Sequence, residues 1–177
     1  YYAMISHVDK RVGNIIQTLK DNGLYENTII IFAGDNGLAV GQHGLMGKQN
    51  VYEHSVGVPL MIKAAAQHTG KKTADLCYLI DVFPTLCDML QLPVPQSVDG
   101  ISLLSSLDGK EPVRDYLYYS YMDNQRGISD GTWKLIEYHV NGKRTTQLFN
   151  LKNDPWERND LSGQKKYEKT IQRLREK

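Results

Sequence analysis

The sequence has only two cysteines, Cys77 and Cys87, and a single pair ten residues apart makes neither a disulfide framework nor a metal-binding cysteine pattern. It has no apolar run approaching the roughly 20 residues that a membrane helix requires. Charge of one sign is not in excess either, since 21 basic and 20 acidic residues leave a formal net charge of +1. These absences argue against a membrane partner and against electrostatic binding of nucleic acid.

What the sequence does contain is typical of a soluble globular protein. Its 177 residues include 41% hydrophobic and 23% charged residues, which are ordinary proportions. A chain of this length can form one domain of good size, or part of a larger core together with a small domain.

The most informative segment begins with the β-branched run Thr28–Phe32, which stops at Ala33-Gly34 and is followed at once by Asp35-Asn36. A short apolar run of this kind predicts a strand buried on both faces, of the parallel α/β type. Ligands of such sheets bind beyond the carboxyl ends of the strands, which is where Asp35 and Asn36 would lie. A carboxylate and an amide oxygen are hard donors that suit Ca²⁺ or Mg²⁺.

The residues around this pair predict an irregular backbone that can approach a ligand closely. Glycines are too frequent there for regular structure, at Gly34, Gly37, Gly41, Gly44 and Gly47. Lys48 follows the last of them and supplies a point charge for an oxyanion. Hard donors, a flexible loop and a lysine together indicate a metal-assisted site for a phosphate or sulfate ester.

This segment reads G-D-N-G-x(3)-G-x-H-G-x(2)-G-K-x(4)-E-x(4)-V-P-L and resembles the C-terminal half of the catalytic core of type I sulfatases, in the alkaline-phosphatase-like superfamily. Three further segments resemble family motifs in the same order, and nearly the whole chain is covered. They are the helix Tyr2–Gly23, the D-x-x-P-T-L start at Asp81–Leu86, and L-x-x-L-x-x-D-P-x-E-x-x-N-L at Leu148–Leu161.

The resemblance implies roles for four residues. Asp35 and Asn36 would be metal ligands, usually for Ca²⁺ with Mg²⁺ as the other candidate, and Lys48 would contact the sulfate ester as a catalytic residue. His43 has counterparts in many but not all sulfatases. It could donate to the substrate or transfer a proton, or it could hold the loop together by hydrogen bonds. Glu53 is expected to be structural, with its side chain bonding the loop backbone.

The chain departs from the family pattern in one respect. Type I sulfatases carry a C-x-P-S-R segment whose cysteine becomes formylglycine, and paired aspartates near the N-terminus. Cys77, in CYLID, and Cys87, in CDMLQ, do not fit that segment. We therefore expect this chain to be the C-terminal part of a longer enzyme, with the formylglycine upstream, and to be inactive alone. Cys87 is expected to be a core residue.

The predicted fold is α/β, namely the C-terminal part of an alkaline-phosphatase-like mixed or parallel sheet core (residues 1–112) and a small antiparallel-sheet and helix subdomain (residues 113–177). The pattern predicts a surface loop at Ala64–Thr73 and, after Asp81 as N-cap, a helix to about Leu90. Asn141-Gly142 between two aromatic-rich runs is a strong hairpin signal. The elements predicted are a helix at Tyr2–Gly23, strands at Thr28–Phe32, Val58–Ile62, Tyr116–Tyr121, Trp133–Tyr138 and Thr145–Leu151, and a helix at Tyr167–Lys177.

Three functions remain open at this point. The first is a sulfuric ester hydrolase, for which the tyrosines of residues 116–121 and Arg126 hint at a sulfated glycan, although packing explains them equally well. The second is a phosphodiesterase or phosphonate hydrolase of the same superfamily, against which Asn36 argues because the metal turn there often reads D-H-G. The third is a non-catalytic binding or dimerising module, with a homodimer formed through an exposed core face.

Overall fold

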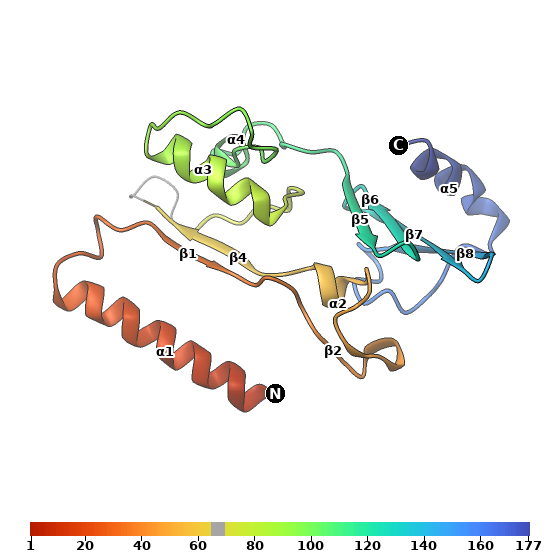
Figure 1. The fold of residues 1–177 in the computed structure, drawn as a ribbon, viewed down its shortest axis with the longest axis horizontal. Coiled ribbons are helices and arrows are strands. Elements are labelled where there is room, and N and C mark those ends of the chain that lie inside the picture. The colour runs from red at the N-terminus through yellow and green to blue at the C-terminus, as the bar shows by residue number, and fades with distance from the viewer. Residues whose placement is uncertain (65–69) are drawn as a thin grey trace. The chain divides into compact units, whose positions relative to one another are not determined.

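The computed structural model describes residues 1–64 and 70–177, and Figure 1 shows their helices and strands. The middle of the predicted loop Ala64–Thr73 lies outside the described residues. Among the helices of the described part, none is long and apolar enough to cross a membrane. The chain forms two compact units, one of Tyr1–Phe32 with Met61–Lys71 and one of Ala33–Leu60 with Lys72–Lys177.

The first unit contains helix α1 (Tyr2–Asp21). Apolar residues recur along it every three or four positions, which is the pattern that predicted this helix. The helix ends before Gly23, whose φ of 67° is a conformation that glycine adopts without strain. None of its residues is buried, and the exposed fractions of Met4 and Ile15 are 71% and 62%. The apolar face of α1 is therefore available for contact.

Strand β1 (Ile30–Ala33) pairs with β4 (Leu60–Lys63) in a two-stranded sheet. Both strands were predicted, although β1 begins and ends slightly later than expected. The prediction that this strand is buried on both faces was wrong, because its residues are half-buried or exposed. A two-stranded sheet gives the strand only one neighbour. Lys63 Nζ, at the end of β4, donates to the carbonyl of Thr28 over 3.1 Å.

The second unit contains a four-stranded antiparallel sheet of order β5-β6-β7-β8. The predicted hairpin at Asn141-Gly142 is confirmed, because both residues have positive φ, 50° and 74°, as a tight two-residue turn requires. The strands are β5 (Leu117–Tyr121), β6 (Gln125–Ser129), β7 (Trp133–Val140) and β8 (Lys143–Asn150).

Both faces of this sheet are covered. On one face, Ile128, Leu135 and Leu148 pack against Ile171 and Leu174 of helix α5 (Glu168–Arg175), which lies within the helix predicted at the C-terminus. On the other face, Ile136 and Phe149 pack against Val51 and Tyr52, which immediately precede α2 (Glu53–Val56). The sheet thus supports the segment that carries the predicted site residues.

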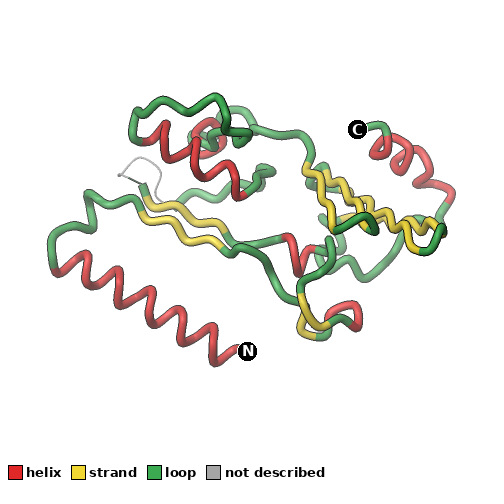
Figure 2. The backbone as a smooth tube through the Cα atoms, in the orientation of Figure 1, coloured by secondary structure: helices red, strands yellow, loops and turns green. Residues whose placement is uncertain are grey.

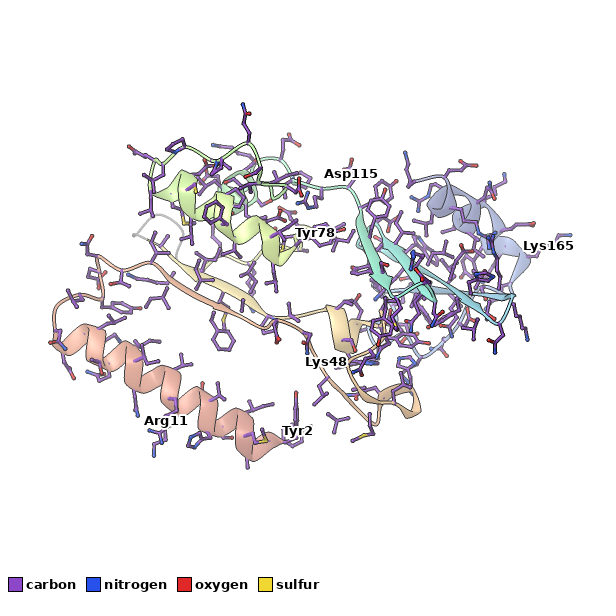
Figure 3. All side chains as sticks on the ribbon, in the orientation of Figure 1. Tyr2, Arg11, Lys48, Tyr78, Asp115 and Lys165 are labelled. Atoms are coloured by element: carbon purple, nitrogen blue, oxygen red, sulfur yellow. The ribbon has the colours of Figure 1, made fainter. Side chains whose placement is uncertain are left out.

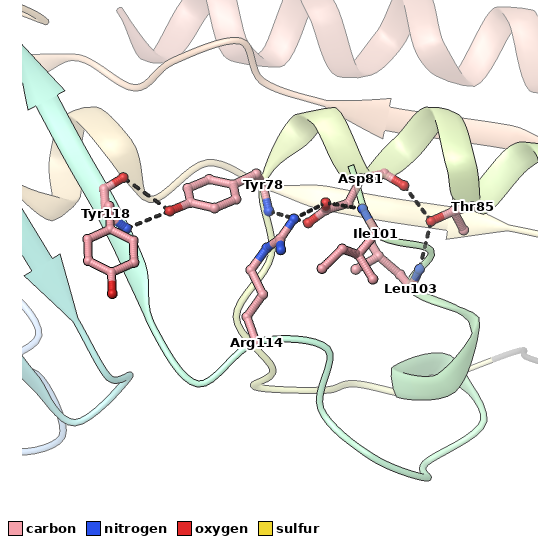
Figure 4. A network of polar contacts seen from close by, with 7 residues as sticks. All are labelled: Tyr78, Asp81, Thr85, Ile101, Leu103, Arg114 and Tyr118. Atoms are coloured by element: carbon pink, nitrogen blue, oxygen red, sulfur yellow. Dashed lines mark hydrogen bonds and ion pairs between the residues drawn. The ribbon is translucent and has the colours of Figure 1, made fainter. Parts of the chain in front are cut away.

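Helix α3 (Val82–Met89) begins after Asp81, as predicted, and Cys87 is buried in it as expected. Asp81 does not cap this helix with its side chain. Its fully buried carboxylate instead accepts the N–H groups of Tyr78 and Ile101, both over 2.8 Å, and pairs with Arg114, as Figure 4 shows. Most of the chain between α3 and β5 is loop, interrupted by α4 (Leu104–Leu107) (Figure 2). The domains predicted for residues 1–112 and 113–177 stay a prediction.

Candidate functional site

The segment after β1 has the irregular backbone that its glycines predicted. Two short strands, β2 (Ala39–Val40) and β3 (Met46–Gly47), pair antiparallel around a single 3-10 turn. Within this hairpin Gly41, Gly44 and Gly47 have φ values of 100°, 71° and 124°. A side chain at any of these positions would be strained. The hairpin places Lys48 directly after β3.

The structure brings three of the four predicted site residues together. The backbone N–H of Asn36 donates to Asp35 Oδ1 over 2.9 Å, and Lys48 Nζ donates to Asn36 Oδ1 over 2.9 Å. Asn36 Nδ2 donates to the carbonyl of Gly37 over 2.8 Å, so the amide is held with its oxygen toward the lysine. Lys48, labelled in Figure 3, and Asp35 are exposed, whereas Asn36 is half-buried.

The turn that carries these residues lies directly on helix α2. The N–H of Gly37 donates to the carbonyl of Ser55 over 2.9 Å. A Cβ added at Gly37 would come within 2.0 Å of the carbonyl oxygen of His54, so only glycine fits. The position of α2 therefore fixes the position of the turn.

Asp35, Asn36 and Lys48 line a cavity of about 860 Å³. Glu53 lies on its wall, as do Tyr119 and Tyr121 of strand β5. The lining therefore combines carboxylates, an amide, an ammonium group and aromatic rings. Such a surface suits a polar ligand that also offers a flat apolar face.

His43 is not among the residues that line this cavity. Its ring stacks on Tyr52, with the ring centroids 4.0 Å apart and the planes inclined by 7°. Its Nε2 lies 3.2 Å from the carbonyl oxygen of Trp156, which can only accept, so Nε2 carries the proton. Together with Gln42, Trp156 and Arg158, His43 lines a second hollow of about 600 Å³.

Three charged residues near the cavity form a cluster that the sequence did not reveal. Lys134 of β7 is fully buried, and its Nζ lies 2.7 Å from Glu53 Oε1 and 3.0 Å from Glu157 Oε1. The expectation that the Glu53 side chain bonds the loop backbone was wrong, because its carboxylate pairs with Lys134. One feature of the sequence could have indicated that Lys134 is buried. In W-K-L-I-E-Y, Lys134 lies two and four positions before Ile136 and Tyr138, and residues at this spacing share one face of a strand.

Burial changes the proton affinity of two groups beside α2. Burial raises the pKa of Glu157, and the ammonium of Lys134 opposes that rise. Burial lowers the pKa of His54, and the charges of His43 and Lys134 lower it further. His54 is thereby favoured in its neutral form near neutral pH, which avoids adding a positive charge beside Lys134.

The donors at the turn fit part of a hard-cation site. Asp35 offers a carboxylate, and Asn36 Oδ1 keeps a second lone pair while it accepts from Lys48. Within residues 1–64 and 70–177 no group of three or more histidine, cysteine, aspartate or glutamate residues could hold a metal ion. Calcium takes about six to eight oxygen ligands, so the turn would supply two of them.

The chain is similar to known sulfatases over nearly its whole length. A family model described as "N-sulphoglucosamine sulphohydrolase, C-terminal" matches residues 41–177. The N-acetylglucosamine-6-O-sulfatase of Bacteroides thetaiotaomicron is 30% identical, and the match covers 98% of this chain and 33% of that protein. Arylsulfatase K of Xenopus laevis is 28% identical, with 93% of this chain and 33% of that protein covered. The chain thus spans about a third of the length of these curated relatives.

Solved structures show the same likeness. A protein in complex with its substrate D-glucosamine-2-N,6-O-disulfate superposes with a TM-score of 0.88 at 29% identity, over 99% of this chain and 38% of that one. The phosphonate monoester hydrolase of Agrobacterium radiobacter superposes with a TM-score of 0.83 at 28% identity, over 99% of this chain and 39% of that one.

Proposed function

The chain belongs to the sulfatase family that the N-sulphoglucosamine sulphohydrolase C-terminal model describes, and we propose that the parent protein is a sulfuric ester hydrolase. The α/β fold class predicted from the sequence is confirmed by its structural neighbours, which are of the alkaline-phosphatase-like superfamily. The observation that carries the proposal is the contact between Lys48 and Asn36 at the wall of the cavity, where a cation for an oxyanion lies beside a hard oxygen donor.

In this proposal Asp35 and Asn36 hold Ca²⁺, or Mg²⁺, through one carboxylate and one amide oxygen. A bound divalent cation supplies positive charge that polarises a sulfate oxygen. Lys48 lines the same cavity, and its exposed ammonium offsets the charge that develops on the ester and leaving oxygens. Its hydrogen bond to Asn36 holds the ammonium in place before substrate binds.

The nucleophile of the proposed reaction is a formylglycine upstream of these residues. Neither cysteine of this chain is suited to the role. Cys87 is buried in α3, and burial followed by the charge of Asp81 raises the pKa of Cys77, which disfavours its thiolate. We therefore propose that the isolated 177-residue chain hydrolyses no sulfate ester.

The role of His43 has two candidates. In the first, the ring accepts a proton from the substrate or water at Nδ1, the nitrogen that does not contact Trp156. In the second, His43 fixes the hairpin by stacking on Tyr52. Its place in the second hollow, away from the lining of the Lys48 cavity, favours the second role.

The proposed substrate class is a sulfated glycan. A structural neighbour binds a disulfated glucosamine, and a relative that is 30% identical is named as an N-acetylglucosamine-6-O-sulfatase. The aromatic residues of β5 on the cavity wall provide faces on which a sugar ring can stack.

Two other functions remain as alternatives. Phosphonate monoester hydrolysis is supported by the likeness to the Agrobacterium radiobacter enzyme. A non-catalytic role of the isolated chain, as a binding module or a homodimer, is supported by the exposed apolar residues of α1.

The test uses the full-length parent protein with an aryl sulfate and, in parallel, an aryl phosphonate monoester. We expect turnover of the sulfate with a kcat/KM that exceeds the value for the phosphonate. A preference for the phosphonate would support the first alternative. Absence of turnover on both esters with added Ca²⁺ would refute the proposal.

A further inference from the structure

The buried lysine of β7 is the strongest feature that the proposed function does not use. Lys134 has no exposed side-chain surface, and its Nζ also lies 4.9 Å from the centroid of the Tyr119 ring. An unpaired ammonium in such surroundings would lose its proton or unfold its neighbourhood. The two carboxylates of Glu53 and Glu157, 2.7 and 3.0 Å from Nζ, make its burial possible.

These carboxylates come from segments that are far apart in the sequence. Glu53 is the first residue of α2, whereas Glu157 lies in the turn that follows β8. Glu157 Oε2 also accepts the backbone N–H of Glu53 over 2.6 Å. That N–H has no partner within the helix, as is general for a first helical turn. Glu53, at the start of α2, is thus held in two ways: Lys134 pairs with its side chain, and Glu157 accepts its backbone N–H.

Helix α2 in turn holds the turn of the candidate site. The carbonyl of Ser55 accepts the N–H of Gly37, and the carbonyl oxygen of His54 lies 2.0 Å from where a Cβ of Gly37 would be. Asn36 precedes Gly37 and accepts from Lys48. An unbroken series of contacts therefore runs from the sheet, through α2, to the residues at the cavity.

Stability alone does not account for such a cluster. A buried ion cluster can often be replaced by apolar residues of similar volume without loss of stability, because the charges must first be removed from water. Directed bonds, by contrast, fix where a short helix lies and how it is rotated. We propose that Lys134 and Glu157 are positioning residues, which place Asn36 and Lys48 through Glu53 and helix α2. The proposal rests on the proposed function for its effect on catalysis.

The test compares the parent protein with the double variant Lys134→Met/Glu157→Gln. Removing both fully buried charges leaves only the carboxylate of Glu53, whose side chain is 30% exposed and can be solvated, so the variant is expected to fold, as circular dichroism would show. We expect kcat to fall by about 10- to 100-fold, the usual effect of losing groups that orient ligands, while KM changes little. We also expect faster hydrogen exchange at the Gly37 amide, which reports the position of the turn without reference to activity.

The matched control is Arg175→Met. It removes an ion pair with Glu137, at 2.7 Å, on the opposite face of the same sheet, and should change neither kcat nor the exchange of Gly37. Unchanged kcat and unchanged Gly37 exchange in the double variant would overturn the positioning role. If the unmodified parent hydrolyses no sulfate ester, the proposed function fails, but the exchange measurement still decides the positioning.

A second variant covers the case in which the double variant does not fold. Lys134→Arg keeps the buried charge but spreads it over a wider, planar group that bonds differently from an ammonium. We expect a several-fold loss of kcat with KM nearly unchanged, and faster exchange at Gly37. A purely structural role predicts parental kcat and exchange in any Lys134→Arg protein that folds, and that result would overturn the proposal.

Discussion

Lys48 Nζ donates to Asn36 Oδ1 over 2.9 Å, although twelve positions separate the two residues in the chain. The contact joins the residue proposed to bind the sulfate to a residue proposed to bind the metal. Both lie on the wall of one cavity, and Asp35 lies there beside them. Substitutions at Lys48 and Asp35 should therefore distinguish loss of the charge that acts on the sulfate from loss of a metal ligand, although both lower turnover.

We expect Lys48→Ala in the parent protein to leave Ca²⁺ affinity nearly unchanged while kcat falls by roughly 10²- to 10³-fold, because the ammonium acts on charge that develops in the transition state. Asp35→Ala should lower both Ca²⁺ affinity and turnover, because it removes a charged ligand. Titration calorimetry with Ca²⁺ and assays on an aryl sulfate measure the two effects. Near-parental kcat/KM in Lys48→Ala would contradict the role proposed for this lysine.

Gly37→Ala should destabilise the chain and lower the activity of the parent. The added Cβ would meet the carbonyl oxygen of His54 at 2.0 Å, and backbone cannot move aside as a flexible side chain can. Overpacking of this kind costs about 1–3 kcal/mol of unfolding free energy. Gly13→Ala is the matched control, since its Cβ would have no neighbour within 4 Å in α1. There, alanine should stabilise by roughly 0.5–1 kcal/mol. Thermal unfolding of both variants tests the contrast.

For His43 we expect loss of the aromatic ring to lower stability clearly. Loss of the ring nitrogens alone should lower kcat only a little. His43→Phe keeps an aromatic ring over Tyr52 and loses the contact with Trp156. His43→Ala loses both. We expect His43→Phe to keep kcat within about tenfold of the parent, and His43→Ala to unfold at a clearly lower temperature. A drop of roughly 10²–10⁴ in kcat for His43→Phe would instead assign proton transfer to this residue.

The elements that the sequence predicted are those whose own residues dictate their structure. The long periodic helix, the aromatic-rich strands and the Asn141-Gly142 turn are examples. Strand β6 was not predicted, because Gln-Arg-Gly-Ile-Ser has little strand propensity. Pairing with its neighbours compensates for this low propensity. Gly127 pairs with Tyr119 of β5, and Tyr119 Cδ2 lies 3.2 Å from where a Cβ of Gly127 would be. Such a strand is specified by its neighbours.

The same distinction holds at the site. Asp35, Asn36 and Lys48 were recognised because they stand in one short segment with glycines around them. The partnership of Lys134 with Glu53 and Glu157 depends on three distant segments, so alternation in β7 places Lys134 on the face of Ile136 without identifying its partners. The packing of Val51 and Tyr52 on that face of the sheet joins residues that are about 85 positions apart, and alternation within one strand carries no information about it.

The pH dependence of stability should contain a contribution from Asp130, in the turn between β6 and β7. Burial raises the pKa of Asp130, but the N–H of Trp133, the guanidinium of Arg173 and the N–H of Thr132 together hold the pKa below its ordinary value. The carboxylate therefore stabilises the fold at pH values above about 4, the pKa of an unfolded aspartate. This stabilisation is lost as the pH falls through the lower folded-state pKa.

We expect Asp130→Asn to lower the unfolding temperature at neutral pH, and the difference from the unmodified chain to shrink as the pH is lowered below about 4. Unfolding followed by circular dichroism between neutral and acidic pH measures this. Asp123→Asn is the control, since the Asp123 side chain is fully exposed and lies 3.8 Å from its partner Arg126. A deficit of Asp130→Asn that stays constant down to acidic pH would contradict the assignment.

The isolated 177-residue chain should self-associate. Helix α1 exposes a stripe of large apolar side chains, with exposed fractions of 71% for Met4, 51% for Val8 and 62% for Ile15. Burial of apolar surface yields about 25 cal/mol per Å², so a second copy can stabilise the pair by covering this face. Sedimentation at tens of micromolar, about the range in which such weak contacts populate, should show dimers or larger species. Met4→Lys/Ile15→Lys should restore the monomer, whereas Lys10→Glu, also in α1, should not. A monodisperse monomer of the unmodified chain at that concentration would show that the exposed face does not drive association.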